Sequence, residues 1–353
     1  MESPPSSQLE LEDLPVKVVV NILEKADYQS LCNVKKVNST LRNITRDLAP
    51  PKFDDIFISC GKDQIRVKMT PFGSNNMDDV VKWKATNHII YANRQGGCSV
   101  HEVKHEVIRD LPMNCLDALC ADMEIPLGKT ETLEELNLVD ETYEGHQFIV
   151  QIGGLLARRD YRINVKNFKI TAFGAHYIME VLPHLDPNHL AIFCIRGSYA
   201  NLPTVQLDRI VNTEQWQSLE SVRLDGCFMP THWNRFEHLK FIDISTTFLT
   251  ADQMTGLKDL CLINEIVEEV HCMDITFPMP IRQLPLFTDR NFLDIEIGRS
   301  VDRHFFFSNP ETRRYIVGIT HEGRNVKIQK WRGKHIPELA FYMAGFERVP
   351  LEE

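Results

Sequence analysis

The sequence predicts an α+β protein in three parts: a small all-α unit near the N-terminus, a region of β-hairpins, and a long α/β region. Three observations lead to this fold class. Apolar residues recur at helical spacing in residues 12–48, short extended runs alternate with turn residues in 51–110, and apolar runs alternate with amphipathic stretches in 111–353. Residues 1–8 are rich in Pro and Ser, and we expect them to form a disordered tail.

The first part contains three predicted helices, and the first of them, residues 16–23, has apolar side chains on two sides. Val18 and Ile22 lie outside its main apolar stripe. Two more helices are predicted, from Asp27 to Val34 and from Val37 to Leu48. A chain below roughly 40 residues cannot bury two helix faces without a metal, disulfides or a partner. We therefore expect the surplus face to bind another protein or to pack on the rest of the chain. The main stripe consists of Val16, Val19, Val20 and Leu23.

The second part contains two predicted hairpins. DDIFIS and QIRVKM flank the turn CGKD, and NHIIYA and CSVHEV flank the turn NRQGG. Glycine supplies the positive φ that such tight turns require. We expect this region to link the helical unit to the third part.

In the third part an apolar pattern Φ-x-x-Φ-x-Φ recurs seven times, with starts 20 to 32 residues apart. This period is close to that of leucine-rich repeats, in which each motif forms a short strand on a concave wall. The pattern predicts an irregular leucine-rich-repeat-like α/β domain, with an ordinary α/β domain as the alternative. Thr250 and Gln253 form a capping box that predicts the start of a helix between two repeats. The motifs are Leu133/Leu136/Leu138, Val165/Phe168/Ile170, Leu190/Phe193/Ile195, Leu219/Val222/Leu224, Leu239/Ile242/Ile244, Val267/Val270/Cys272 and Phe292/Ile295/Ile297.

Composition restricts the function. The 353 residues include 39 basic and 49 acidic side chains, a net charge of −10, which disfavours nucleic acid and anionic membranes as partners. No apolar stretch reaches the ~20 residues needed to cross a bilayer. The first fifteen residues lack a secretory signal, and the nine cysteines include no C-x-x-C pair. We expect reduced cysteines in an intracellular protein of the cytoplasm or nucleus.

The N-terminal residues resemble an F-box. The run LEDLPVKVVVNILEKADYQSLCNVKKVNSTLR, from Leu11 to Arg42, is similar to the F-box of a large nematode family whose second domain is called FTH. Lys17 stands where an acidic residue is common, and Leu41 replaces a frequent aromatic residue. Further matches in the family's order are Gly97-Cys98-Ser99-Val100, Glu214-Gln215-Trp216, the F-x-H-L from Phe236 to Leu239, and the D-x-x-x-L-K-D-L from Asp252 to Leu260.

This resemblance implies a non-catalytic substrate adaptor of a cullin–RING ubiquitin ligase. The F-box, residues 9–50, would dock on the Skp-type linker protein, and an FTH domain in residues 111–353 would hold a target protein. Neither a cofactor nor a metal is implied. A protein-interaction scaffold without ligase function remains an alternative. Trp216, Trp233 and Trp331 are candidates for target contact, with burial in the core as the other possibility. The residues that the resemblance assigns to linker contact, or else to the F-box's own core, are Leu14, Pro15, Val18, Ile22, Leu23, Tyr28, Leu31 and Val34.

Two motifs resemble catalytic or nucleotide-binding sequences. His101-Glu102-Val103-Lys104-His105 matches the H-E-x-x-H of zinc proteases, which needs both histidines one turn apart on a helix. The motif follows a predicted hairpin, so we expect a chance match on a solvated stretch and keep a zinc hydrolase as a remote alternative. Gly128-Lys129-Thr130 ends like a phosphate-binding loop, but Met123 stands where its first glycine is required.

The charge is unevenly distributed along the chain. Residues 16–46 contain six basic and two acidic side chains, a balance of +4, which leaves −14 for the remainder. A cationic helical unit suits an acidic protein partner, and Skp-type linkers are acidic as a family. Opposite charge would mainly speed and orient docking, while the apolar face supplies affinity.

Overall fold

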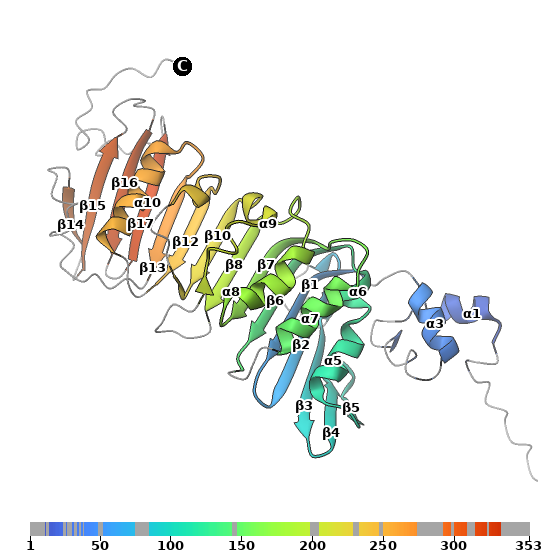
Figure 1. Ribbon diagram of the computed structural model, residues 1–353. Coiled ribbons are helices and arrows are strands. Elements are labelled where there is room, and N and C mark those ends of the chain that lie inside the picture. The colour runs from blue at the N-terminus through green and yellow to red at the C-terminus, as the bar shows by residue number, and fades with distance from the viewer. Residues whose placement is uncertain are drawn as a thin grey trace, which may run out of the picture.

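A computed structural model represents the chain, and its described residues form two separate hydrophobic cores. The small core lies in the N-terminal helical unit, and the large core lies beneath one face of an extended sheet. Figure 1 shows α1 (Val16–Leu23) and α3 (Ser39–Asp47) beside one end of the sheet. The described residues are 11, 14–23, 26, 30–31, 34, 37, 39–48, 52–74, 85–142, 147–197, 205–228, 233–246, 250–273, 292–297, 300–308, 315–322 and 325–332.

The helical unit begins as its sequence predicts. Pro15 precedes α1, and its carbonyl oxygen accepts hydrogen bonds from the amides of Val18 (2.7 Å) and Val19 (3.2 Å). Between α1 and α3, Ser30, Leu31, Val34 and Val37 are also helical. Asp27, the expected cap of a second helix, lies outside the described residues.

An antiparallel block forms one end of the sheet, in the order β1-β2-β3-β4-β5. Both predicted hairpins are confirmed: β1 pairs with β2 and β3 pairs with β4. Gly96 has a φ of 86° in the second turn, a conformation that L side chains rarely adopt. The strands are β1 (Phe53–Cys60), β2 (Gln64–Pro71), β3 (Asn87–Arg94), β4 (Gly97–Glu102) and β5 (Val107–Leu111).

A parallel block of six strands forms the middle of the sheet, and its strands neighbour one another in chain order. The last two apolar residues of each of the first six motifs lie on these strands, and in four motifs the first residue precedes the strand. Their central residues occupy paired positions on successive strands, namely Leu136, Phe168, Phe193, Val222, Ile242 and Val270. The strands are β6 (Thr132–Asp140), β7 (Asn164–Ala172), β8 (Ile192–Gly197), β10 (Ser221–Asp225), β12 (Phe241–Ser245) and β13 (Glu269–Met273).

The stacked motifs build the large core. All six central residues are at most 1% exposed, and the rings of Phe168 and Phe193 stack with centroids 5.2 Å apart. The helices lie on one face of the sheet, in front of the strands in Figure 1. They are α5 (Cys115–Met123), α6 (Pro126–Lys129), α7 (Gln147–Ala157), α8 (Ala175–Val181), α9 (Glu214–Gln217) and α10 (Ala251–Ile263), with 3-10 turns η3 (Val103–His105), η4 (Leu182–His184) and η5 (Asn234–Phe236).

The predicted capping box is present at the start of α10. The Gln253 amide donates to Thr250 Oγ1 at 3.2 Å, and the Thr250 amide donates to Gln253 Oε1 at 3.0 Å. Each of these contacts satisfies a backbone donor that the helix itself cannot pair.

At the far end of the sheet, the prediction that the seventh motif continues the parallel strands is wrong. Phe292, Ile295 and Ile297 lie on β14, which pairs antiparallel with β15 at the sheet edge instead of extending the parallel run. The strand next to β13 is β17, also antiparallel. An apolar triplet alone does not distinguish strand directions, which explains the wrong prediction. This end consists of β14 (Phe292–Ile297), β15 (Ser300–Ser308), β16 (Tyr315–Glu322) and β17 (Asn325–Arg332), and a small pair lies elsewhere, β9 (Val205–Gln206) with β11 (Cys227–Phe228).

The hairpin region continues directly into the parallel block. β1 pairs in parallel with β6, with Ile56 opposite Leu136 and Ile58 opposite Leu138. The sheet therefore crosses the expected boundary between residues 110 and 111 without interruption.

No helix among the described residues is long and apolar enough to span a membrane.

Candidate protein-interaction sites

The helical unit buries one side of α1 and exposes the other. Val19 and Leu23 are buried in the small core, whereas Val18 is 40% exposed and Ile22 is 43% exposed. The apolar pair lies four residues apart and therefore on one face of the helix. The core is too small to cover this second face, as the sequence predicts. The buried residues of this core are Val19, Leu23, Leu31, Leu41 and Leu48.

The residues predicted to contact the linker protein divide into three groups. Pro15, Val18 and Ile22 are exposed. Leu14 and Val34 are half-buried against the small core. Leu23 and Leu31 are members of that core, the role that the sequence left open for them, and Tyr28 lies outside the described residues.

The surface of α1 also has cationic character. Lys17 is exposed beside Val18. On α3, Arg42 is exposed as well. Both basic side chains belong to the helical unit and agree with its positive charge balance.

The zinc-like motif does not have the geometry of a zinc site. His101 lies on β4 and His105 lies on η3, so the two histidines do not share a helix. Glu106 follows with a φ of 53°, which ends the short turn. The expectation of a solvated stretch is wrong for Glu102, because this side chain is 1% exposed and pairs with Arg109. Over the described ranges, no group of three or more His, Cys, Asp and Glu side chains is placed to hold a metal ion.

The eight cysteines of the described residues are free thiols, and five of them are buried. Burial raises the pKa of Cys120 to about 11 and that of Cys227 to about 12. Such thiols stay protonated near neutral pH and are poor nucleophiles. Their role is packing, as the sequence predicts, and Cys32 lies outside the described residues.

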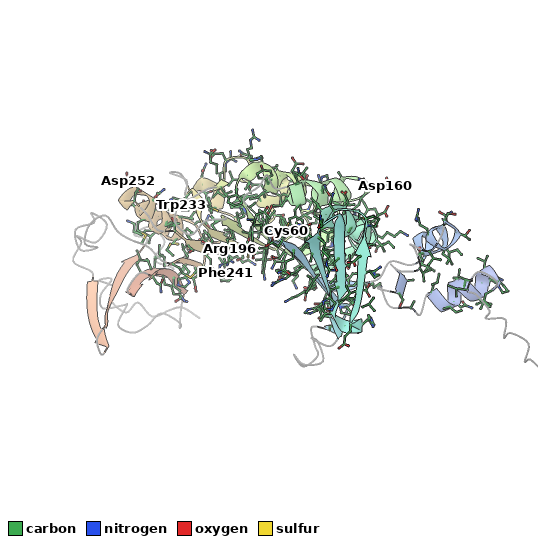
Figure 2. The ribbon with its side chains drawn as sticks, turned by 90° about the horizontal axis from the view of Figure 1, so that it is seen from below. Cys60, Asp160, Arg196, Trp233, Phe241 and Asp252 are labelled. Carbon is green, nitrogen blue, oxygen red and sulfur yellow. The ribbon has the colours of Figure 1, made fainter. Side chains whose placement is uncertain are left out.

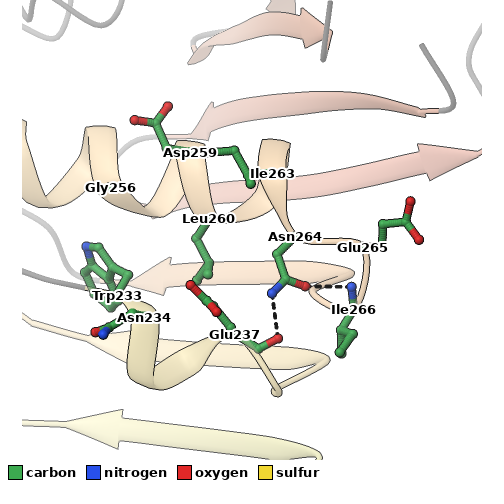
Figure 3. Close-up of a pocket in the computed structure, with 10 residues that line it drawn as sticks. All are labelled: Trp233, Asn234, Glu237, Gly256, Asp259, Leu260, Ile263, Asn264, Glu265 and Ile266. Carbon is green, nitrogen blue, oxygen red and sulfur yellow. Dashed lines mark hydrogen bonds between the residues drawn. The ribbon is translucent and has the colours of Figure 1, made fainter. Parts of the chain in front are cut away.

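A groove lies on the helix side of the sheet, between the turn at η5 and the C-terminal half of α10 (Figure 3). Its volume is about 820 Å³. Trp233 packs edge-on against Phe236, with ring centroids 5.1 Å apart, and supports one wall. The lining residues are Trp233, Asn234, Glu237, Gly256, Asp259, Leu260, Ile263, Asn264, Glu265 and Ile266.

Hydrogen bonds from Asn264 hold the two walls of the groove together. Its Nδ2 donates to the Glu237 carbonyl oxygen at 2.7 Å, and its Oδ1 accepts from the Ile266 amide at 2.7 Å, as the dashed lines in Figure 3 show. Nζ of Lys330 on β17 donates to the Asn264 carbonyl oxygen. One side chain thus links the η5 turn, the end of α10 and the following loop.

Two of the three candidate tryptophans, Trp216 and Trp233, are buried, which is the alternative that the sequence left open. Trp216 is fully buried, and its Nε1 donates to the Arg235 carbonyl oxygen at 2.8 Å. Trp233 is 5% exposed and lines the groove only at its base. The side chain of Trp331 lies outside the described residues. Sequence periodicity missed the groove, because its exposed apolar residues, Ile263 and Ile266, lie at and beyond a helix end.

The opposite face of the sheet bears polar side chains that pair across strands. Figure 2 shows Arg196 and Phe241 on this face, and Trp233 and Asp252 on the helix side. Arg196 Nε lies 3.1 Å from Asp225 Oδ2. Further pairs across strands are Lys169 with Glu135 at 2.6 Å and Lys327 with Glu269 at 3.1 Å.

Comparison with known families identifies both parts of the chain. A family model of the F-box domain matches residues 11–53, which include α1 and α3. A family model of the FTH domain matches residues 146–290, which include the strands from β7 to β13 and the groove beside α10. No curated protein matches the chain. The class of protein is thus that of the F-box proteins. More specifically, this chain is an F-box protein with a C-terminal FTH domain, as the sequence resemblance predicts.

Proposed function

We propose that the chain is a non-catalytic substrate-recognition adaptor of an SCF-type (Skp–cullin–F-box) ubiquitin ligase. Its F-box binds the Skp-type linker protein, and its FTH domain binds a target protein. The adaptor increases the effective concentration of target lysines near the charged conjugating enzyme and performs no chemistry itself. The chain works inside the cell, in the cytoplasm or nucleus. The observation that carries the proposal is the exposed apolar pair Val18 and Ile22 on an F-box helix.

The linker-binding surface is centred on α1. Pro15, Val18 and Ile22 provide the apolar contacts, and Leu14 and Val34 contribute their exposed edges. Leu23 and Leu31 support this surface from below. Tyr28 completes the set of contacts that the family resemblance assigns.

In this proposal each of the three expected parts of the chain has its own role. Residues 9–50 dock on the ligase, residues 51–110 extend the sheet as a hairpin block, and residues 111–353 present the target. The six in-register motifs support a leucine-rich-repeat-like architecture for the parallel block, because each repeat buries its apolar face against the next. This stacking produces a rigid body that can hold a target.

Co-purification with a Skp-type linker tests the proposal. We expect the full chain to bind the linker and the Val18→Asp/Ile22→Asp variant to lose binding, because two charges replace the apolar contact. Ile108→Asp is a matched control, since Ile108 is an exposed aliphatic residue on β5 of the sheet. The absence of binding by the intact chain would sink the proposal. Because charge steers encounter, the association rate should also fall as salt rises, while the complex persists.

The same variant separates a ligase adaptor from a scaffold. In cells, Val18→Asp/Ile22→Asp retains the target-binding body but cannot reach the ligase. For an adaptor, a protein that co-purifies with the variant accumulates to a higher level than it does with the wild-type chain. Unchanged abundance and ubiquitination of every co-purifying protein would instead indicate a scaffold without ligase function.

A further inference from the structure

The groove beside α10 has the features of a peptide-binding site. Two aliphatic side chains at one end of it are strongly exposed, Ile263 at 76% and Ile266 at 50%. Single exposed aliphatic residues are ordinary on protein surfaces, but here two of them line the same concavity. The volume of about 820 Å³ is sufficient for several side chains of a partner.

Buried and closely packed residues form the base of the groove. Leu260 and Trp233 are buried there, and the Trp233 indole packs directly against Gly256. A Cβ atom added at Gly256 would lie 2.3 Å from Trp233 Cδ1, so the absence of a side chain permits this close packing. With Asn264 joining the two walls, the concavity does not depend on the conformation of a mobile side chain.

The charge of the groove favours a basic occupant. Its ionisable lining residues, Glu237, Asp259 and Glu265, are all acidic. Lys258 lies 3.2 Å from Asp259 and offsets part of this charge, but it is not itself a lining residue. An acidic rim beside an apolar wall complements an apolar side chain flanked by Lys or Arg.

The other face of the sheet is a weaker candidate for target binding. Its charged side chains already pair with one another across strands, at Arg196–Asp225 and Lys169–Glu135 for example. A partner there would have to replace existing ion pairs, whereas in the groove it would cover exposed aliphatic surface.

We propose that the groove between the η5 turn and α10 binds a short segment of a target protein that carries a bulky apolar residue flanked by Lys or Arg. This inference rests on the proposed adaptor function and names the chemistry of the target. The apolar residue enters the hollow above Leu260 and Trp233 and contacts Ile263 and Ile266. The flanking cations lie against Glu237 and Asp259.

An array of synthetic nine-residue peptides tests the inference with the full chain. Each peptide has a central Leu, Ile, Phe or Trp flanked by Lys/Arg, by Asp/Glu or by Ser. We expect binding by the basic series, and fluorescence polarisation of the best peptide gives its dissociation constant. Equal binding of all three series, or preference for acidic flanks, would overturn the inference.

Variants of the groove locate the bound peptide. Ile263→Ser/Ile266→Ser should weaken binding at least tenfold, and Glu237→Lys/Asp259→Lys should shift the preference to acidic flanks. Val150→Ser is the matched control, because Val150 is an exposed aliphatic residue on α7, outside the groove. Peptide binding that survives both groove variants would place the site elsewhere and overturn the inference.

Two other occupants give distinct results. If a second copy filled the groove, light scattering would show a dimer that Ile263→Ser/Ile266→Ser dissociates. If another part of the same chain filled it, this variant would lower the melting temperature of the peptide-free protein, and no peptide would bind. Either result overturns the inference. Linker binding is measured in parallel. A chain that binds peptide but no linker contradicts the proposed adaptor function and still supports peptide binding by the groove.

Discussion

The helical unit and the parallel block differ in how completely they bury their apolar side chains. Each consists of short elements that cannot bury their apolar sides alone. In the parallel block the neighbouring repeat covers each motif, so that Phe168, Phe193 and Val222 are all fully buried. The helical unit has no neighbouring repeat, and Val18 and Ile22 stay exposed. Size therefore explains why the apolar residues of the parallel block are covered while some of those in the helical unit stay exposed.

Charge separates the two regions as well. The helical unit has a surplus of basic side chains, whereas the remainder of the chain has a balance of −14. On the sheet, part of this charge is paired across strands, as between Lys327 and Glu269. The two proposed partners therefore differ in charge, with an acidic one for the F-box and a basic one for the groove.

The largest expected effect comes from a substitution that leaves a cavity in the large core. Phe193→Ala removes a ring that stacks on Phe168 and should lower the free energy of unfolding by about 3–5 kcal/mol. Because the two cores are separate, binding of the Skp-type linker should remain unchanged. Urea unfolding and linker titration measure both quantities.

Phe241→Ala provides the control for this variant, since Phe241 lies exposed on the open face and its loss should change stability by less than about 0.5 kcal/mol. Parallel loss of linker affinity in Phe193→Ala would show that the two regions unfold together.

A neighbouring pair on α1 distinguishes support from contact. Leu23→Ala should destabilise the helical unit by about 2–5 kcal/mol, because Leu23 is part of the small core. Ile22→Ala should leave stability nearly unchanged and weaken linker binding directly. Circular dichroism and calorimetric titration of both variants provide the test. A destabilised Ile22→Ala protein would mean that this residue belongs to the core.

A smaller effect is expected at the start of α10, which forms one wall of the groove. Thr250→Ala removes the side-chain acceptor of the Gln253 amide and should cost about 1 kcal/mol. Thr250→Ser preserves the acceptor and should retain most of the stability. Thermal unfolding compares the two, and equal melting temperatures would argue against a role for the cap.

The smallest effect is expected from pH. Burial lowers the pKa of His238 below its usual 6.5, although its Nε2 is hydrogen-bonded to the Trp216 carbonyl oxygen at 2.7 Å. The unfolded chain therefore takes up the proton first, so the stabilisation is complete above pH 6.5 and is lost as the pH falls toward the folded pKa.

His238→Gln retains a donor for that carbonyl without titrating near neutral pH. It should reduce the drop in melting temperature between pH 7.5 and 5.5. Burial also lowers the pKa of His88 and His184, so a residual drop is expected in this variant. An unchanged drop would exclude a contribution from His238.

Local spacing accounts for the features that could be predicted. The burial of Val19 and Leu23 on α1, the glycine turn at Gly96 and the capping box at Thr250 each involve residues within a few positions of one another. The stripe predicted on α1 was wrong at Val16, which is 62% exposed. The Φ-x-x-Φ-x-Φ motif also predicted which six strands share one core. It failed at Ile295, where the same triplet lies on an antiparallel strand.

The candidate site was only partly predictable. Exposure of Val18 and Ile22 follows from the small size of the helical unit, but the sequence did not distinguish these residues from the core residues Leu23 and Leu31. The groove was not predicted, because Trp233, Gly256 and Asn264 meet only after the η5 turn packs against α10.

The sequence alone was sufficient to identify the F-box, the strand motifs of the parallel block and the charge contrast, because these depend on composition and on residues close together in the chain. Only the folded structure revealed the parallel pairing of β1 with β6, the antiparallel end of the sheet and the acidic groove beside α10. These features arise from contacts between distant segments, whose pairing depends on loop closure and mutual burial and leaves no local pattern in the sequence.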